Sequence, residues 1–145
     1  MKIKKIVIPY DGSTHSKHAF DTALDLAQKY KSKLFLITCI EKLDGSLFGK
    51  DLSLNYQKDV QKFKEKILRD MSKLESISKE HKVSLTSKIL ITDHPMKKIL
   101  SFTKSNQIDL IVMGSHGRTG LDKLILGSVA NGIVQRSKIP VLIVR

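Results

Sequence analysis

The sequence predicts an α/β protein built on a doubly wound sheet of five parallel strands. Five short, nearly continuous apolar runs alternate with longer amphipathic segments along the chain. Parallel strands that helices cover on both faces have this composition. The last apolar run has no helical segment after it. A response-regulator receiver ends on a helix and carries several acids at its strand tips, so this class of protein is excluded.

The first half of the chain contains two predicted strands and two predicted helices. A strand over residues 3–9 leads into Asp11-Gly12-Ser13-Thr14, a turn and helix-start signal, and the helix that follows runs to about Tyr30. The second strand covers residues 33–40, and residues 41–53 predict a loop of the length that is often functional. A long helix over about 54–81 has an apolar stripe, which consists of Val60, Phe63, Ile67, Met71, Leu74 and Ile77.

The second half contains three further strands, over residues 83–91, 108–113 and 139–144. Pro95 begins a short helix that runs to about residue 105, and Gly127-Ser128 begins another. Asn131-Gly132 lies inside the latter. Because a glycine in a helix interior costs roughly 1 kcal/mol relative to alanine, we expect this helix to fray or bend. No linker or internal repeat divides the 145 residues, so we predict one domain, 1–145.

The glycine spacing near the end of the chain carries the strongest functional signal. Gly114-Ser115-His116-Gly117-Arg118-Thr119-Gly120 follows the fourth apolar run, and Gly127-Ser128 lies ten residues past Gly117, giving G-x2-G-x9-G-S. A glycine-rich strand tip and a helix start both offer backbone N–H groups to an anion. The spacing predicts phosphate binding, although glycines also serve as plain turns and Ser128 could be an ordinary N-cap. It matches neither a Walker A loop nor the G-x-G-x-x-G dinucleotide motif.

Composition narrows the class of partner. The formal net charge is +12, but the basic residues are dispersed: residues 57–82 hold eight Lys or Arg against five acids, as on a solvated helix face. We therefore expect no specific nucleic-acid binding, while the basic field would attract an anionic nucleotide. The single cysteine cannot form an internal disulfide. The first apolar run is too short for a signal peptide and no stretch approaches a membrane span, which predicts a cytoplasmic protein with no membrane partner.

Over its whole length the chain resembles the universal stress protein family, in its ATP-binding branch. The resemblance rests on residues 6–13, on the glycine-rich segment 114–120, on Leu126-Gly127-Ser128-Val129-Ala130 and on residues 140–145. The glycine spacing is the ATP signature of that family. The resemblance implies a sheet in the order 3-2-1-4-5. The tips of strands one and four then lie side by side at the topological switch point, where such sheets bind ligands.

The resemblance also assigns roles around an adenine nucleotide. The residues concerned are Pro9, Asp11, Cys39, Met113, Gly114, Gly117, Arg118, Gly127, Ser128 and Val129. Asp11 would lie near the ribose or help to place a Mg²⁺ or Mn²⁺ ion, and the backbone of Cys39, a position more often valine in the family, would bond the adenine edge. Met113 and Gly114 would flank the ribose. Arg118 would face either a phosphate or solvent.

Gly117, Gly127, Ser128 and Val129 would cradle the phosphates through backbone N–H groups and the Ser128 hydroxyl. His116 is the only histidine that the sequence places near this site, and His15 is expected on an exposed helix turn. The family also implies a homodimer that forms along strand 139–144, an apolar edge that needs a partner.

The sequence offers few candidates for catalysis. No Ser/His/Asp or Cys/His set and no paired carboxylates at one strand tip can be assembled. Asp11 is the only candidate general base and the only acid expected beside the phosphates. The sequence therefore predicts a nucleotide-responsive ATP-binding module. The alternatives are a slow ATPase or phosphotransferase that uses Asp11 and a cation, and a partner-binding module of the same fold without nucleotide.

Overall fold

The computed structural model describes residues 1–42, 50–118 and 125–145. Its sheet has five strands in the order β3-β2-β1-β4-β5, and every neighbouring pair is parallel. The strands are β1 (Lys5–Pro9), β2 (Lys33–Ile40), β3 (Leu85–Ile91), β4 (Leu110–Gly114) and β5 (Val141–Val144). The predicted fold class and the strand order implied by the family resemblance are both confirmed.

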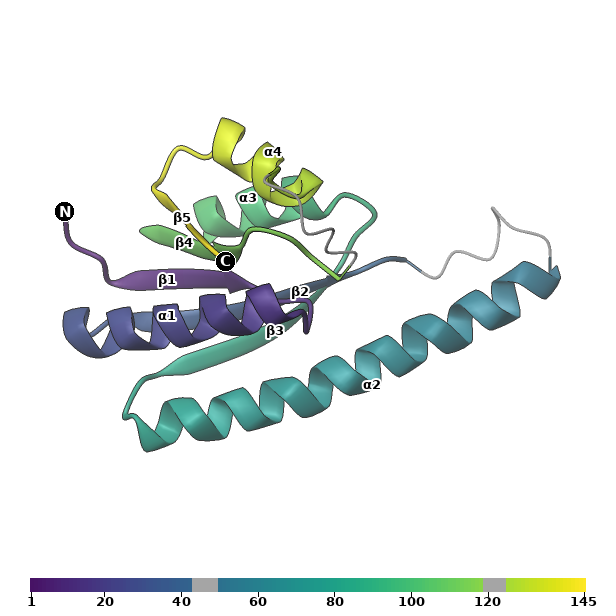
Figure 1. Cartoon of the computed structure of the whole chain (residues 1–145), viewed down its shortest axis with the longest axis horizontal. Coiled ribbons are helices and arrows are strands. Elements are labelled where there is room, and N and C mark those ends of the chain that lie inside the picture. The colour runs from purple at the N-terminus through teal and green to yellow at the C-terminus, as the bar shows by residue number, and fades with distance from the viewer. Residues whose placement is uncertain (43–49, 119–124) are drawn as a thin grey trace.

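Helices cover both faces of the sheet (Figure 1). α1 (Thr14–Tyr30) and α2 (Lys50–Glu80) lie on one face, and α3 (Pro95–Ser105) and α4 (Ser128–Arg136) on the other. Alternate residues of β1 divide between two apolar cores: Ile6 and Ile8 pack beneath α1 and α2, and Val7 packs beneath α3 and α4. All three are fully buried. This two-sided burial explains why the central strands have continuous apolar sequences.

Helix α1 begins and ends at residues suited to those positions. Ser13 is its N-cap, in agreement with the helix-start signal in the sequence, and the Ser13 hydroxyl accepts a hydrogen bond from the Ser16 N–H at 3.2 Å. Lys31 ends the helix with a left-handed φ of 55°, and its N–H donates to the Ala27 carbonyl. Both ends are fixed locally, so α1 starts directly after the tip of β1.

Helix α2 is longer than the sequence predicted. It starts at Lys50, four residues before the expected start, and this shortens the predicted 41–53 loop, of which residues 43–49 lie outside the described part. Ile67 and Met71 are buried against the sheet, whereas residues 54–59 are all exposed. The first half of α2 projects beyond the carboxyl ends of the strands (Figure 1).

The predicted strand starts also need correction, since β1, β3 and β4 each begin two residues later than expected. The last strand starts at Val141 rather than at residue 139. Pro140 precedes it, has no N–H to donate, and contributes only its carbonyl, which accepts the Ile111 N–H at 3.0 Å. Helix α4 runs without a break from Ser128 to Arg136, so the bend or fraying expected near Gly132 is absent from it. Gly132 is buried against the side chain of Met96, which supports the helix at this point.

Candidate functional site

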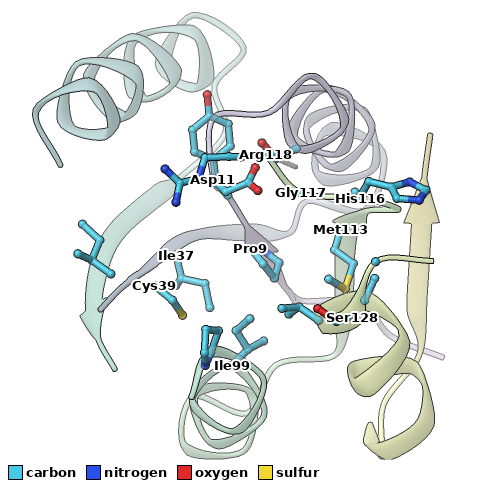
Figure 2. Close-up of a pocket in the computed structure, with 18 of the residues that line it drawn as sticks. Pro9, Asp11, Ile37, Cys39, Ile99, Met113, His116, Gly117, Arg118 and Ser128 are labelled. Atoms are coloured by element: carbon cyan, nitrogen blue, oxygen red, sulfur yellow. The ribbon is translucent and has the colours of Figure 1, made fainter. Parts of the chain in front are cut away.

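A cavity of about 530 Å³ opens at the carboxyl ends of the central strands. β1 pairs with β2 on one side and with β4 on the other, so the chain changes winding direction between β1 and β4. Open α/β sheets bind their ligands at such a point. Figure 2 shows side chains from β1, β2, β4, α3 and α4 around this cavity.

The structure brings the ten predicted site residues together. Every one of them lines the cavity: Pro9, Asp11, Cys39, Met113, Gly114, Gly117, Arg118, Gly127, Ser128 and Val129. They come from strand ends, a loop and the start of α4, and Pro9 and Gly114 are 105 residues apart in the chain. The sheet order brings them together. The nucleotide-binding roles given to them above stay predictions.

Two glycines of the loop allow close approaches that a larger residue would block. A Cβ atom on Gly114 would lie 2.8 Å from the Cβ atom and 2.9 Å from the carbonyl carbon of His15, in the first turn of α1. A Cβ atom on Gly117 would lie 2.8 Å from Oδ2 of Asp11. These contacts bring the tips of β1 and β4 close enough to enclose one cavity between them.

The start of α4 forms another part of the wall. Gly127 is the N-cap of this helix, so Ser128 is its first residue and not its cap. The Gly127 N–H donates to the Ser115 carbonyl at 2.8 Å, which fixes the helix start against the glycine loop. Within the described residues no side chain caps this end of α4. The N–H groups of its first turn therefore remain for an anion, and the helix dipole favours negative charge there.

Asp11 has one oxygen engaged and one turned toward the loop. Its Oδ1 accepts the Ser13 N–H at 3.0 Å, while Oδ2 lies beside Gly117. Glu41 and Asp59 line the same cavity, while the expectation that Asp11 is the only acid beside the phosphates stays a prediction. Glu41 accepts a hydrogen bond from the Tyr56 hydroxyl. Across residues 1–42, 50–118 and 125–145, no three His, Cys, Asp or Glu side chains converge on one point as metal ligands.

Apolar side chains line the part of the cavity between β2 and α3. Ile37, Cys39 and Ile99 lie there, away from Arg118 (Figure 2). Burial raises the pKa of the Cys39 thiol to about 11, against a smaller lowering by Lys98. The thiol is therefore neutral near pH 7 and behaves as a small apolar group. This region suits the flat, largely apolar face of an aromatic ring.

Arg118 is exposed and lines the cavity, and it makes one contact that the sequence did not predict. Its guanidinium stacks on the ring of Phe63 in α2, 3.7 Å from the ring centroid. The contact connects the glycine loop to α2 across the cavity. Phe63 and Val60 line the cavity, although their spacing in the sequence indicated only the apolar stripe of the helix. The apolar spacing of Val60 and Phe63 is the same for a core residue and for a cavity-lining residue, so the sequence could not predict their place in the site.

A second histidine lies near the loop, which corrects the sequence-based view that His116 is the only one. The rings of His15 and His116 are 5.5 Å apart between centroids and tilted by 53°. His15 is half-buried rather than exposed, because the close approach at Gly114 brings the first turn of α1 against the loop. His116 Nδ1 also lies 3.1 Å from the Ser115 hydroxyl.

A hydrogen-bonded group ties α2 to the tip of β1. The Tyr10 hydroxyl donates to Asp70 at 2.9 Å, and Lys66 bonds the same carboxylate at 3.2 Å. Burial opposes the charged form of Asp70, but the bonds from Tyr10 and Lys66 outweigh it and hold the pKa of this carboxyl below its usual value. Burial, followed by the Asp70 contact, raises the pKa of Tyr10. This group holds α2, and with it Phe63, over the cavity.

Comparison with known proteins assigns the family. A family model for the universal stress protein family matches residues 2–145. The chain belongs to the universal stress protein family. Universal stress protein MJ0531 of Methanocaldococcus jannaschii is 30% identical to it over 142 residues, which cover 98% of this chain and 82% of that protein. No helix that the structure describes is both long and apolar enough to cross a bilayer.

Solved universal stress proteins share the fold. UspA from Lactobacillus plantarum superposes with a TM-score of 0.86 at 20% identity, over 100% of this chain and 99% of that one. A universal stress protein in complex with cAMP gives a TM-score of 0.72 at 23% identity, over 100% of this chain and 99% of that one. The Archaeoglobus fulgidus protein in complex with dAMP gives 0.64 at 18% identity, over 100% of both chains.

Proposed function

We propose that this universal stress protein binds an adenine nucleotide, with ATP as the ligand, and acts as a nucleotide-responsive binding module. One observation carries the proposal: a glycine loop and an uncapped helix start line a single cavity at the switch point of the sheet. A phosphate chain would accept hydrogen bonds from backbone N–H groups at Gly117, Ser128 and Val129. The Gly127 N–H, which the family resemblance also implied as a donor, is bonded to the Ser115 carbonyl instead. The base would lie against Ile37, Cys39 and Ile99. Two family members of the same fold were solved with cAMP and with dAMP, which supports adenine as the base.

The residues present fit a divalent cation that accompanies ATP. Magnesium binds with one or two carboxylates together with phosphate oxygens and water. Asp11 supplies one carboxylate oxygen, Oδ2, on the side of Gly117, where the phosphates would pass. A Mg²⁺ or Mn²⁺ ion held there would neutralise phosphate charge. Asp11 would orient the ion from the tip of β1, and its other oxygen would keep the turn at Ser13 in place.

Slow ATP hydrolysis is the second candidate function, and the acidic residues of the cavity favour it. Glu41 and Asp59 line the cavity together with Asp11, so the described site contains carboxylates that could orient a water molecule. Turnover above a few per hour that Asp11→Asn abolishes would support hydrolysis. Turnover that survives in Asp11→Asn but is lost in Asp59→Asn would show that Asp59, on α2, orients the water molecule.

We further propose that the protein forms a homodimer along β5. This strand is an edge of the sheet, and Leu142 is 38% exposed on it. An apolar edge with unpaired backbone groups favours pairing with a second copy.

Nucleotide binding is tested first by mass spectrometry of the ligand released from freshly purified protein, and then by calorimetric titration with ATP. Gly117→Val should push Asp11 away from the loop, and Gly127→Val should crowd the Ser115 carbonyl, which lies 3.3 Å from the added Cβ position. Each variant should bind ATP at least tenfold more weakly, roughly 1.4 kcal/mol. Both should keep the circular dichroism of the wild type, because they alter a loop and a helix start. Wild-type affinity in both variants would disprove the phosphate cradle.

A further inference from the structure

A second, more open cavity of about 640 Å³ adjoins the first and has a different chemical character. We call it the basic groove. Lys62, Lys66 and Arg118 line it together with His15, and Asp11 is the only carboxylate among its lining residues in the described chain. Three full positive charges thus face one negative charge. Two of the eight basic residues of segment 57–82, Lys62 and Lys66, face this groove.

The basic groove continues the main cavity. Asp11, Phe63, Gly117 and Arg118 line both cavities and form the boundary between them. The predicted phosphate cradle at Gly117 lies on this boundary. A chain of phosphates that leaves the cradle past Gly117 would enter the basic groove, with the stacked pair of Arg118 and Phe63 beside it.

The lysines are placed to meet such a chain. Lys62 and Lys66 are four residues apart on α2 and so lie on one face of the helix. The Lys66 ammonium reaches over the turn between β1 and α1, because a Cβ atom on Gly12 would lie 2.5 Å from its Nζ. Among the described residues Lys62 forms no ion pair, and Lys66 pairs only with Asp70. Asp70 also accepts the Tyr10 hydroxyl, so that carboxylate keeps a donor if Lys66 turns toward a phosphate.

We propose that the basic groove binds the terminal phosphates of a nucleoside polyphosphate, so that the protein selects nucleotides with at least three phosphates over monophosphates. This inference rests on the proposed function, since the base and first phosphate would occupy the main cavity. Lys62 and Lys66 contribute the selectivity. A monophosphate would be held by the cradle alone and would gain nothing from these two residues.

The experiment compares AMP and ATP by calorimetry in the wild type and in the double variant Lys62→Gln/Lys66→Gln. An exposed charge contact changes affinity by about two- to fivefold, so the double variant should bind ATP about tenfold more weakly and AMP less than twofold more weakly. Salt should weaken ATP binding less in the variant than in the wild type. Arg69→Gln/Lys73→Gln is the matched control. It removes two charges at the same spacing on α2 from residues that line neither cavity, and should leave the ratio of the two affinities unchanged.

Lys66→Gln also removes the ion pair with Asp70, so the single variant Lys62→Gln provides a test that leaves this pair intact. It should lose part of the ATP affinity and none of the AMP affinity. Equal weakening of ATP and AMP binding, or no change in either, would overturn the proposal. Binding of inorganic tripolyphosphate distinguishes failure of the groove proposal from failure of the proposed nucleotide binding. If the wild type binds no adenine nucleotide but binds tripolyphosphate through Lys62 and Lys66, the proposed function is wrong, while the assignment of the groove as a polyphosphate site is supported. If tripolyphosphate also fails to bind, the groove is disproved.

Discussion

Replacing Gly114 with alanine should destabilise the whole domain, because this residue lies where β4 and α1 come closest. The added methyl group would point at the backbone of the first turn of α1. Its carbon would lie 2.8 Å from the His15 Cβ and 2.9 Å from the His15 carbonyl carbon. Favourable carbon–carbon contacts lie at about 3.5–4.0 Å, so the two elements would have to separate by roughly 0.6 Å or more.

The cost follows from what has to move. The crowded atoms are the carbonyl group of His15 and its Cβ, which the helix backbone holds in place. That helix packs on β1 and β4 through Ala19, Phe20 and Ala23, all fully buried. Forcing extra volume into a well-packed region costs about 1–3 kcal/mol. In a protein of this size 1 kcal/mol lowers the melting temperature by about 2–4 °C. We therefore expect Gly114→Ala to melt about 2–12 °C below the wild type.

Thermal unfolding followed by circular dichroism measures this difference, and Gly132→Ala is the matched control. Its added methyl group would meet Sδ and Cγ of Met96, atoms of a flexible side chain that can change rotamer. Alanine is also favoured over glycine inside a helix by about 1 kcal/mol. The control should melt at or above the wild-type temperature. An unchanged melting temperature for Gly114→Ala would refute the conclusion that the close approach of β4 and α1 requires a glycine at this position.

Three further outcomes are expected. Asp11→Asn should reduce the gain in ATP affinity that Mg²⁺ or Mn²⁺ provides in calorimetry; equal metal dependence in both proteins would limit Asp11 to its turn with Ser13. Leu142→Asp places a charge on the exposed side of β5 and should give a folded monomer by light scattering; a wild type that is already monomeric at micromolar concentration would exclude the dimer. Asp70→Asn removes a carboxyl whose pKa is lowered in the folded state. The stability difference from wild type in chemical unfolding should be complete at neutral pH and shrink as the pH falls below about 4, and a difference independent of pH would refute this role.

The periodicity of apolar residues predicted which segments are strands and which are helices, because the pattern of burial differs between the two. It predicted the ends less well. Val83 and Ile108 are buried and apolar, so both were placed in strands. Instead their N–H groups donate to the carbonyls of Ser78 and Thr103 in the preceding helices, at 2.9 and 3.0 Å. An apolar side chain indicates that a residue is buried, but it does not indicate which backbone group its N–H meets.

The part of the candidate site at strand tips could be predicted, since the sheet order alone brings Asp11 and Gly114 together. The part contributed by α2 could not. Phe63 lines the cavity and Ile67 fills the core, yet the two belong to the same apolar stripe. The difference lies in how far the helix extends past the sheet. That extent depends on tertiary packing, and so does the stacking of Arg118 on Phe63.

The projecting half of α2 has a thermodynamic consequence for any ligand. Residues 54–62 have no buried side chain, and a helical segment of this length without packing is marginally stable in water. Its amide hydrogens should therefore exchange with solvent much faster than those near Ile67. Val60 and Phe63 belong to the cavity wall only when this part of the chain is helical, so a ligand that contacts them binds only the helical form of the segment. Ligand binding in the cavity and helix formation over residues 54–62 are then coupled, so each favours the other. Part of the intrinsic binding free energy is used to order the helix, so the measured affinity is lower by that amount.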